Sequence, residues 1–247
     1  VILGTNTRYY LLGESANPAG LTFQQYHGSP EAMLQAQVRF VEWDRHNLLQ
    51  DARLGLPEAG WDVRVDFQNY YEAAWLGCPI EYVDGEVPDT LPAYADDSRK
   101  REIFDLCPTP WSGIMALNLE YYQHMRRRQA EGFEYRGLPI RTVSPTALGT
   151  DGPFTIACNV RGAAEICLDL YTDPGYAREL LDFITEAVIA RITAYREFLG
   201  EPVVRPSFGW ADDSIQNLST ELYAEFVLPC HRKLVAAFAD PNSAPYL

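Results

Sequence analysis

The chain has 247 residues, 47% of them apolar, which is enough to bury the core of one large α/β domain. Its net charge of −14 disfavours binding to nucleic acid or to an anionic membrane, because both are polyanions. Five scattered cysteines, none spaced as C-x-x-C, indicate neither a disulfide framework nor a zinc ribbon. No apolar run is as long as a membrane helix and no signal sequence opens the chain, so we expect a cytoplasmic protein.

The first periodic segments predict a helix followed by a strand. Residues 29–49 place apolar side chains at helical spacing, with Ser29 as N-cap and Pro30 at the first helical position. Residues 61–71 alternate between apolar and polar side chains instead, which predicts a strand. The polar face of that strand carries Arg64, Asp66 and Gln68.

The middle of the chain is irregular, then helical, then extended. Residues 84–112 are rich in Pro and Asp and predict a long irregular connection. A helix is expected over about 114–131. The segment LPIRTVSPTALGTDGPFTIA, residues 138–157, predicts a strand followed by an extended loop, because glycines and prolines interrupt it.

The last hundred residues continue the alternation of helices and strands. A long helix is predicted after the cap Asp173 and stops at Gly200, with an apolar stripe that includes Leu180, Ile184 and Val188. A strand is expected over 202–210, followed by a helix that kinks near Pro229. This order is typical of βαβ units around a parallel sheet.

Parallel sheets bind ligands at the carboxyl ends of their strands, so polar residues there are candidate site residues. Neighbours on a strand face opposite ways, so only one of the adjacent acids Asp212 and Asp213 can point into a cavity. Either acid can instead end the strand or cap a turn. The candidates at the three strand ends are Asp66, Gln68 and Tyr70, then Asp151, Gly152 and Phe154, then Asp212 and Asp213.

The sequence lacks the common catalytic motifs. It contains no G-x-S-x-G, no Walker loop and no G-x-G-x-x-G. None of its four histidines stands at a metal-ligand spacing, and we expect His124 and His231 on helix surfaces. These observations favour neither a nucleotide site nor a serine nucleophile.

Four segments together resemble the uroporphyrinogen decarboxylase superfamily. They are QNYYEAAWLGCPIEYVDGEVPDT at 68–90, GPFTIA at 152–157, LYTDPGYARELLDFITEAV at 170–188 and DDSIQNLSTELYAEFVLP at 212–229. The resemblance spans roughly residues 20–240 and implies a (β/α)8 TIM barrel with its site at the carboxyl face of the strands. It also implies a small-molecule substrate.

The superfamily has two main chemistries, and the departures of this chain favour one of them. The decarboxylases, which are carboxy-lyases of tetrapyrrole biosynthesis, use an arginine-bearing stretch near their start, but residues 20–31 contain no arginine. The tyrosine expected after GPFT is replaced by Cys158 and Asn159. The resemblance therefore points toward methyl transfer between a small methylated substrate and a corrinoid protein or a thiol. A non-catalytic module that binds a small molecule or a corrinoid protein is the remaining alternative.

The resemblance also implies roles for individual residues. Asp66 and Asp213 are the expected catalytic residues, since Asp66 lies near the essential strand-end acid of the decarboxylases and Asp213 matches a substrate-binding hydroxyl. Zinc, if used, would be held by an H-x-C pair and a later cysteine beyond Leu247, and a decarboxylase-like protein would need no cofactor. The expected substrate-binding residues are Gln68, Tyr70, Asp151, Gly152, Phe154, Asn159 and Asp212.

The number of strands limits the expected barrel. Only about three barrel strands can be placed, near 62–68, 139–146 and 202–210, whereas closure needs eight. We therefore expect residues 1–247 to form a single barrel domain that is incomplete at its C-terminus. A homo-oligomer is compatible with the sequence.

Overall fold

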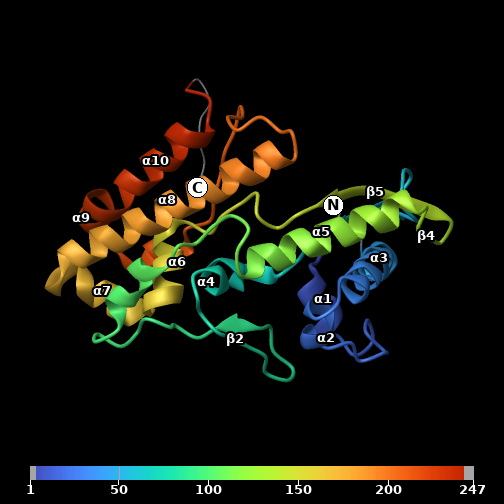
Figure 1. The fold of residues 1–247 in the computed structure, drawn as a ribbon. Coiled ribbons are helices and arrows are strands. Elements are labelled where there is room, and N and C mark those ends of the chain that lie inside the picture. The colour runs from blue at the N-terminus through green and yellow to red at the C-terminus, as the bar shows by residue number, and fades with distance from the viewer. Residues whose placement is uncertain (1–3, 50, 242–247) are drawn as a thin grey trace. The chain divides into compact units, whose positions relative to one another are not determined.

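The computed structural model describes residues 4–49 and 51–241, and these form a mostly helical α/β protein (Figure 1). The chain divides into two compact units, each described here by itself. Unit 1 contains the described residues within 1–68, 82–89 and 117–146. Unit 2 contains residues 69–81 and 90–116 and the described residues from 147 onward. None of the helices in the described ranges is long and apolar enough to cross a membrane.

Unit 1 is built on α3 (Pro30–Asn47) and a three-stranded sheet. The predicted cap is confirmed, because the Ser29 hydroxyl accepts a hydrogen bond from the Ala32 N–H at 3.3 Å. α3 buries one side against β1 through Met33, Leu34 and Val38. The other helices of the unit are α1 (Thr7–Leu12), α2 (Phe23–His27) and most of α5 (Ile114–Ala130), which confirms the predicted helix over 114–131.

The sheet of unit 1 has the strand order β1-β5-β4. β1 (Trp61–Arg64) lies parallel to β5 (Leu138–Ser144), with Val63 opposite Val143. β4 (Glu134–Tyr135) pairs antiparallel with β5 through a two-residue turn at Arg136 and Gly137. Both turn residues have positive φ, at 55° and 74°, as the tight hairpin turn requires.

The predicted strand over 62–68 is too long. β1 ends at Arg64, and the chain turns into the 3-10 turn η1 (Gln68–Tyr70), where Gln68 has a φ of 53°. Val65 and Phe67 are buried as expected, and Asp66 is buried as well, whereas Arg64 on the same polar face is exposed. The strand ends because the left-handed Gln68 turns the chain and because Asp66 is held by the hydrogen bonds described below.

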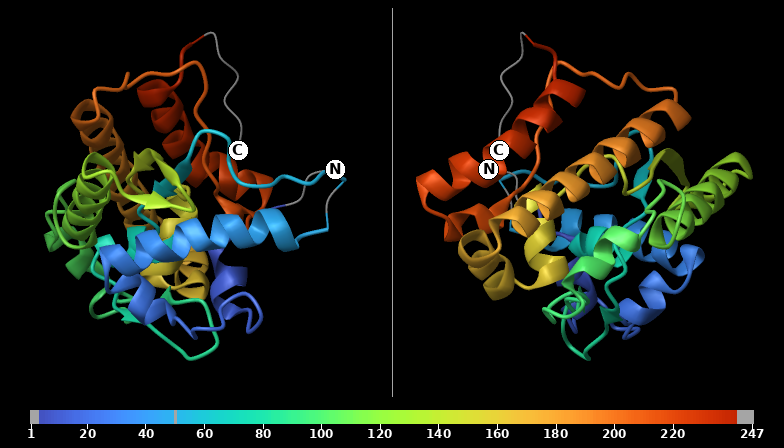
Figure 2. Two further views of the ribbon diagram at one scale, coloured as in Figure 1. Left: turned by 90° about the vertical axis from the view of Figure 1, so that its right-hand side faces the viewer. Right: turned by 60° about the vertical axis from the view of Figure 1, so that its left-hand side comes forward.

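Unit 2 is a cluster of helices around α8 (Pro174–Phe198). The predicted cap Asp173 accepts from the Tyr176 N–H at 3.2 Å, and Gly200 ends the segment with a φ of 68°. α6 (Pro153–Arg161), α7 (Ala163–Thr172) and α10 (Leu228–Phe238) contact α8, and α10 lies alongside it in Figures 1 and 2. The predicted apolar stripe of α8 is buried in full: Ala177, Leu180, Leu181, Ile184, Val188, Ile192 and Tyr195.

The helix before α10 changes its winding, as Pro229 predicts. α9 (Thr220–Leu222) is followed by a π-helical turn, η4 (Tyr223–Val227), and then by α10. Proline has no N–H and its ring clashes with the carbonyl four residues earlier, so the α-helical hydrogen-bond pattern cannot continue through this point.

Two segments differ from their predicted extended conformation. One of them is helical and the other forms no regular strand. Residues 153–157 begin α6, because Pro153 takes the first helical position after Gly152. Residues 202–210 form no regular strand but contain isolated bridge residues, of which Arg205 pairs in parallel with Ala239. Pro202 and Pro206 flank Arg205 and cannot donate to a ladder, so the pairing at Arg205 does not extend into a strand.

The remaining short elements connect the larger ones. α4 (Tyr71–Trp75) follows η1, and β2 (Ile80–Glu81) and β3 (Asp89–Thr90) form a separate two-stranded sheet. The predicted irregular connection is confirmed over most of its length, and it contains one 3-10 segment, η2 (Lys100–Asp105). A further 3-10 segment, η3 (Asp213–Asn217), precedes α9.

A buried ion pair in unit 2 holds the segment that precedes α6. Glu72 on α4 and Arg191 on α8 have side chains that are 2% and 0% exposed, and Arg191 Nη2 lies 2.5 Å from Glu72 Oε1. Glu72 also accepts from the Thr150 hydroxyl and the Asp151 N–H, both at 2.7 Å. Arg191 donates in addition to the Gly149 carbonyl at 2.8 Å. The pair therefore fixes residues 149–151 between two helices.

Replacing one partner of this pair should destabilise unit 2 strongly. In Arg191→Met the Glu72 carboxylate stays buried without its cation, and we expect a loss of about 3–5 kcal/mol in the free energy of unfolding. Urea denaturation followed by circular dichroism measures it. The matched control is Arg178→Met on the same helix, whose ion pair with Glu225 is exposed and should contribute less than about 1 kcal/mol. Equal losses in the two variants would contradict the role of the buried pair.

Candidate functional site

A buried carboxylate, that of Asp212, lies at the amino end of α6 in unit 2. It accepts hydrogen bonds from the backbone N–H groups of Phe154, at 3.3 Å, and Thr155, at 2.7 Å. These groups belong to the first turn of the helix, where N–H donors have no partner within the helix. The positive end of the helix dipole and these two donors stabilise the buried negative charge.

His231 on α10 binds the same carboxylate. Its Nε2 lies 2.8 Å from Asp212 Oδ2, and its Nδ1 lies 3.2 Å from the Tyr223 hydroxyl. The ring packs edge-on against Trp210, with centroids 4.9 Å apart. The prediction that His231 lies on a helix surface is wrong, because its side chain is 4% exposed. Helical spacing places it on the buried stripe of α10 with Leu234.

Gly152 makes the close approach of Asp212 to α6 possible. The Gly152 N–H donates to the Ala211 carbonyl at 2.8 Å, and the neighbouring Asp151 pairs with Ala211 as an isolated parallel bridge. A Cβ atom at position 152 would overlap the Asp212 side chain. The Ser214 N–H then donates to the Thr155 hydroxyl at 3.0 Å, which fastens the start of η3 to α6.

Two further carboxylates, of Asp151 and Asp213, lie at this end of α6. Asp213 is exposed and Asp151 is half-buried, and neither side chain has a hydrogen bond within the described ranges. Burial raises the pKa of Asp151 from 3.8 to about 7, and the charges of Glu72, Asp213 and Asp212 add to the rise while Arg191 opposes it. Asp151 can therefore take up or release a proton near neutral pH.

A second cluster surrounds Asp66 in unit 1. Its carboxylate accepts hydrogen bonds from the Tyr26 hydroxyl at 3.0 Å and from both the backbone N–H and the side-chain amide of Gln68, at 2.9 to 3.1 Å. Gln37 Nε2 donates to the Tyr26 hydroxyl at 3.0 Å. The positive φ of Gln68 is backbone strain at a candidate site, and the two bonds to Asp66 offset it.

His27 is buried beside the Asp66 cluster. Its ring lies 5.1 Å from the ring of Tyr26 and 5.9 Å from that of Phe67. Burial lowers the pKa of His27 to about 4, although the negative charge of Asp66 opposes the shift. The imidazole is therefore neutral at physiological pH.

The structure brings the predicted site residues together in two groups. Asp66 and Gln68 bond to each other in unit 1. In unit 2, Asp151, Gly152, Phe154, Asp212 and Asp213 meet at the start of α6. The side chain of Phe154 is in the core, Asn159 is half-buried about two turns further along α6, and Tyr70 is buried in η1. Their assignment to substrate binding stays a prediction.

Three side chains of the site were missed by sequence reasoning: Glu72, Arg191 and His231. The signal for two of them is their helical position, because Arg191 stands three residues after Val188 on the buried stripe of α8 and His231 stands on that of α10. A charged or polar residue on an apolar stripe needs a buried partner. Glu72 carries no such signal.

Among residues 4–49 and 51–241, no three His, Cys, Asp or Glu side chains are arranged to hold a metal ion. Cys230 and His231, which have the wrong order for the zinc motif, have other contacts, since the Cys230 thiol lies near the Phe226 carbonyl and His231 binds Asp212. The zinc ligands that the resemblance implies would lie beyond Leu247 and so outside the described residues.

An alanine at position 152 should separate Asp212 from α6. We expect Gly152→Ala to lower the free energy of unfolding by about 1–3 kcal/mol, because the added methyl forces the carboxylate away from its two donors. The control is Gly149→Ala, where an added Cβ has no atom within 4 Å. Thermal unfolding of both variants measures the effect, and equal midpoints would show that Asp212 does not depend on a glycine there.

The raised pKa of Asp151 predicts a pH-dependent cost to folding. Between about pH 4 and pH 7 the folded protein holds a proton on Asp151 that the unfolded chain releases, so this group destabilises the fold progressively as the pH rises toward 7. Asp151→Asn should remove that cost. Its free energy of unfolding should therefore increase relative to the unmodified protein from pH 4 to pH 8, and a constant difference would contradict the shift.

Comparison with known proteins supports the resemblance seen in the sequence. A methylated-thiol:coenzyme M methyltransferase of Methanosarcina mazei is 28% identical over 216 residues, which are 82% of this chain and 52% of that protein. The solved structure of a methyltransferase from Methanosarcina mazei aligns with a TM-score of 0.59 at 18% identity, over 99% of this chain and 62% of that one. The chain thus spans about half the length of the curated relative and less than two thirds of the solved structure.

The family assignment rests on a longer match. The sequence profile described as uroporphyrinogen decarboxylase (URO-D) matches residues 6–246, nearly the whole chain. This range contains all four of the segments on which the resemblance was based and both carboxylate clusters. The predicted resemblance is confirmed, and the chain belongs to the uroporphyrinogen decarboxylase (URO-D) family.

Proposed function

We propose that this protein is a methyltransferase that moves a methyl group between a small methylated substrate and a corrinoid protein or a thiol. Support comes from the family and from the relative at 28% identity, whose name states a methylated thiol and coenzyme M as its substrates. We also propose that the parallel pair β1 and β5 belongs to a (β/α)8 barrel, the fold that membership of the family implies.

The charge of the site in unit 2 is the observation that carries the proposal. Asp151, Asp212 and Asp213 lie at the start of α6, and only Asp212 among them is held by donors. A tetrapyrrole with several carboxylate arms would be repelled here, and residues 20–31 offer no arginine to hold it. A small methylated compound, or a thiol with a single negative charge such as coenzyme M, meets much less repulsion than a polyanion. The cluster therefore favours methyl transfer over decarboxylation.

Asp151 supplies the proton chemistry in this proposal. A carboxylate with a pKa of about 7 is suited to act as a general base at neutral pH. It takes the proton from the sulfur of a bound thiol, and the resulting thiolate forms a bond to the methyl carbon while the departing group keeps the electron pair of its bond to that carbon. We assign substrate binding to the exposed carboxylate of Asp213 and a second catalytic role to Asp66. No residue is assigned to a metal ion, because no three His, Cys, Asp or Glu side chains among the described residues are arranged to hold one.

Methyl transfer from methylcobalamin to coenzyme M tests the proposal. Proton NMR of the S-methyl product gives the rate, and Asp151→Asn should lower kcat/KM at pH 7 by roughly a hundredfold, the usual contribution of a general base. The control variant is Asp182→Asn on the exposed face of α8, where Asp182 pairs with Lys233. An Asp151→Asn variant as active as this control would overturn the role of Asp151.

Two other outcomes would replace the proposed activity. Release of carbon dioxide from uroporphyrinogen III, with no transfer to coenzyme M, would identify a carboxy-lyase. Saturable binding of methylcobalamin without turnover, measured by calorimetry, would identify a non-catalytic binding module. Both assays use the same purified protein, so the three activities can be compared at equal concentration.

A further inference from the structure

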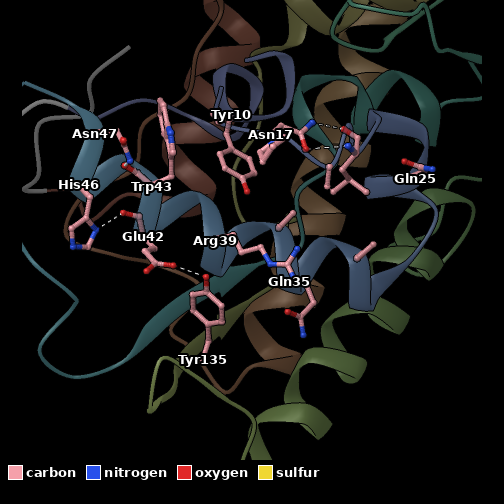
Figure 3. Close-up of a pocket in the computed structure, with 16 residues that line it drawn as sticks. Tyr10, Asn17, Gln25, Gln35, Arg39, Glu42, Trp43, His46, Asn47 and Tyr135 are labelled. Atoms are coloured by element: carbon pink, nitrogen blue, oxygen red, sulfur yellow. Dashed lines mark hydrogen bonds between the residues drawn. The ribbon is translucent and has the colours of Figure 1, made fainter. Parts of the chain in front are cut away.

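A cavity of about 670 Å³ lies along one face of α3 in unit 1 (Figure 3). Its lining residues come from α1, the loop after it, α2, α3 and β4, and they include neither Asp66 nor any other residue assigned to methyl transfer. The volume falls in the range of cavities that bind small organic ligands. The question is which ligand its walls would accept.

One wall of the cavity is aromatic. The rings of Tyr10 and Trp43 meet edge to face with centroids 6.2 Å apart, and Phe40 lies 5.9 Å from Tyr10 on the same helix as Trp43. Tyr10 is only 7% exposed, so packing fixes the position of its ring. Aromatic walls of this kind bind planar rings by stacking or edge contacts.

The loop that lines the cavity between α1 and α2 is held in place before any ligand binds. Asn17 donates from its amide nitrogen to the carbonyls of Leu11 and Leu21, both at 2.9 Å, and accepts from the Leu21 N–H at 3.0 Å. These three bonds close the loop between α1 and α2. A preformed wall lowers the entropy cost of binding.

The polar side chains of the cavity differ in whether they are already paired. Glu42 accepts from the Tyr135 hydroxyl at 2.5 Å and from Arg136 at 2.9 Å, and His46 Nδ1 lies 2.7 Å from the Glu42 carbonyl (Figure 3). The guanidinium of Arg39, by contrast, makes no hydrogen bond or ion pair with any residue in the described ranges. It lies near Tyr10, since burial raises the pKa of the Tyr10 phenol and the charge of Arg39 opposes that rise.

We propose that this cavity is a binding site for a planar aromatic carboxylate. The five N–H donors of Arg39 match the two oxygens of a carboxylate, and the aromatic wall of Tyr10 and Trp43 receives the ring. An anion is favoured over a cation because the only acidic side chain of the lining, Glu42, already has two partners. This site is independent of the proposed methyl transfer.

Isothermal titration calorimetry of the whole chain with 2-naphthoate tests this site. We expect one molecule bound per chain, and 2-naphthalenemethanol, which has the same ring without the charge, should bind at least tenfold more weakly. Arg39→Gln should weaken 2-naphthoate binding by a similar factor. The matched control is Arg53→Gln, because Arg53 is exposed in unit 1 and does not line the cavity.

The results that support the binding site differ from those that overturn it. Binding that Arg39→Gln weakens at least tenfold and Arg53→Gln preserves supports the site, provided that circular dichroism shows both variants folded. Equal affinity of the two variants, or no saturable binding to the unmodified protein, would overturn it. Trp43→Leu gives an independent check, because loss of the ring should weaken both probes together.

Discussion

The hydrogen bonds of the buried Asp212 carboxylate determine how the site of unit 2 is built. An unpaired carboxylate with no exposure would be very costly, so the fold must supply donors from several elements. They come from the first turn of α6 and from His231 on α10. This requirement explains why Gly152 has no side chain and why α10 carries a histidine on its buried face. The positions of Asp212, the first turn of α6 and α10 therefore depend on one another.

The orientation of Asp212 also decides what its neighbour does. Because Asp212 turns inward to cap α6, Asp213 faces solvent and keeps its carboxylate available. Asp151 lies at the same end of α6, because an isolated parallel β-bridge joins its backbone to that of Ala211. Burial, with repulsion from Glu72, Asp213 and Asp212, raises the pKa of Asp151 to about 7. The site therefore combines a structural carboxylate, Asp212, with one that can exchange a proton at neutral pH.

Each unit contains a buried acidic side chain, and the groups that bind that side chain differ between the two units. In unit 1 the acid is Asp66, whose donors are neutral groups of Tyr26 and Gln68. In unit 2 the buried acid Glu72 is paired with the fully buried guanidinium of Arg191. Hydrogen bonds from neutral donors leave the charge of Asp66 in place, whereas Arg191 compensates that of Glu72. The distinction fits a functional role for Asp66 and a structural role for Glu72.

The sequence by itself determined the helices α3, α5, α8 and α10, the family and which short segments carry the acids. The caps Ser29 and Asp173, the stripe of α8 and the break before Pro229 are local, because helix propensity and capping involve residues only a few positions apart. Tertiary structure alone decided that β1 stops before Asp66, that residues 202–210 form isolated bridges instead of a strand, and that His231 and Arg191 meet acids 19 and 119 residues away. Such pairings depend on how distant segments share donors in a low-dielectric interior, and no local pattern in a single sequence encodes that.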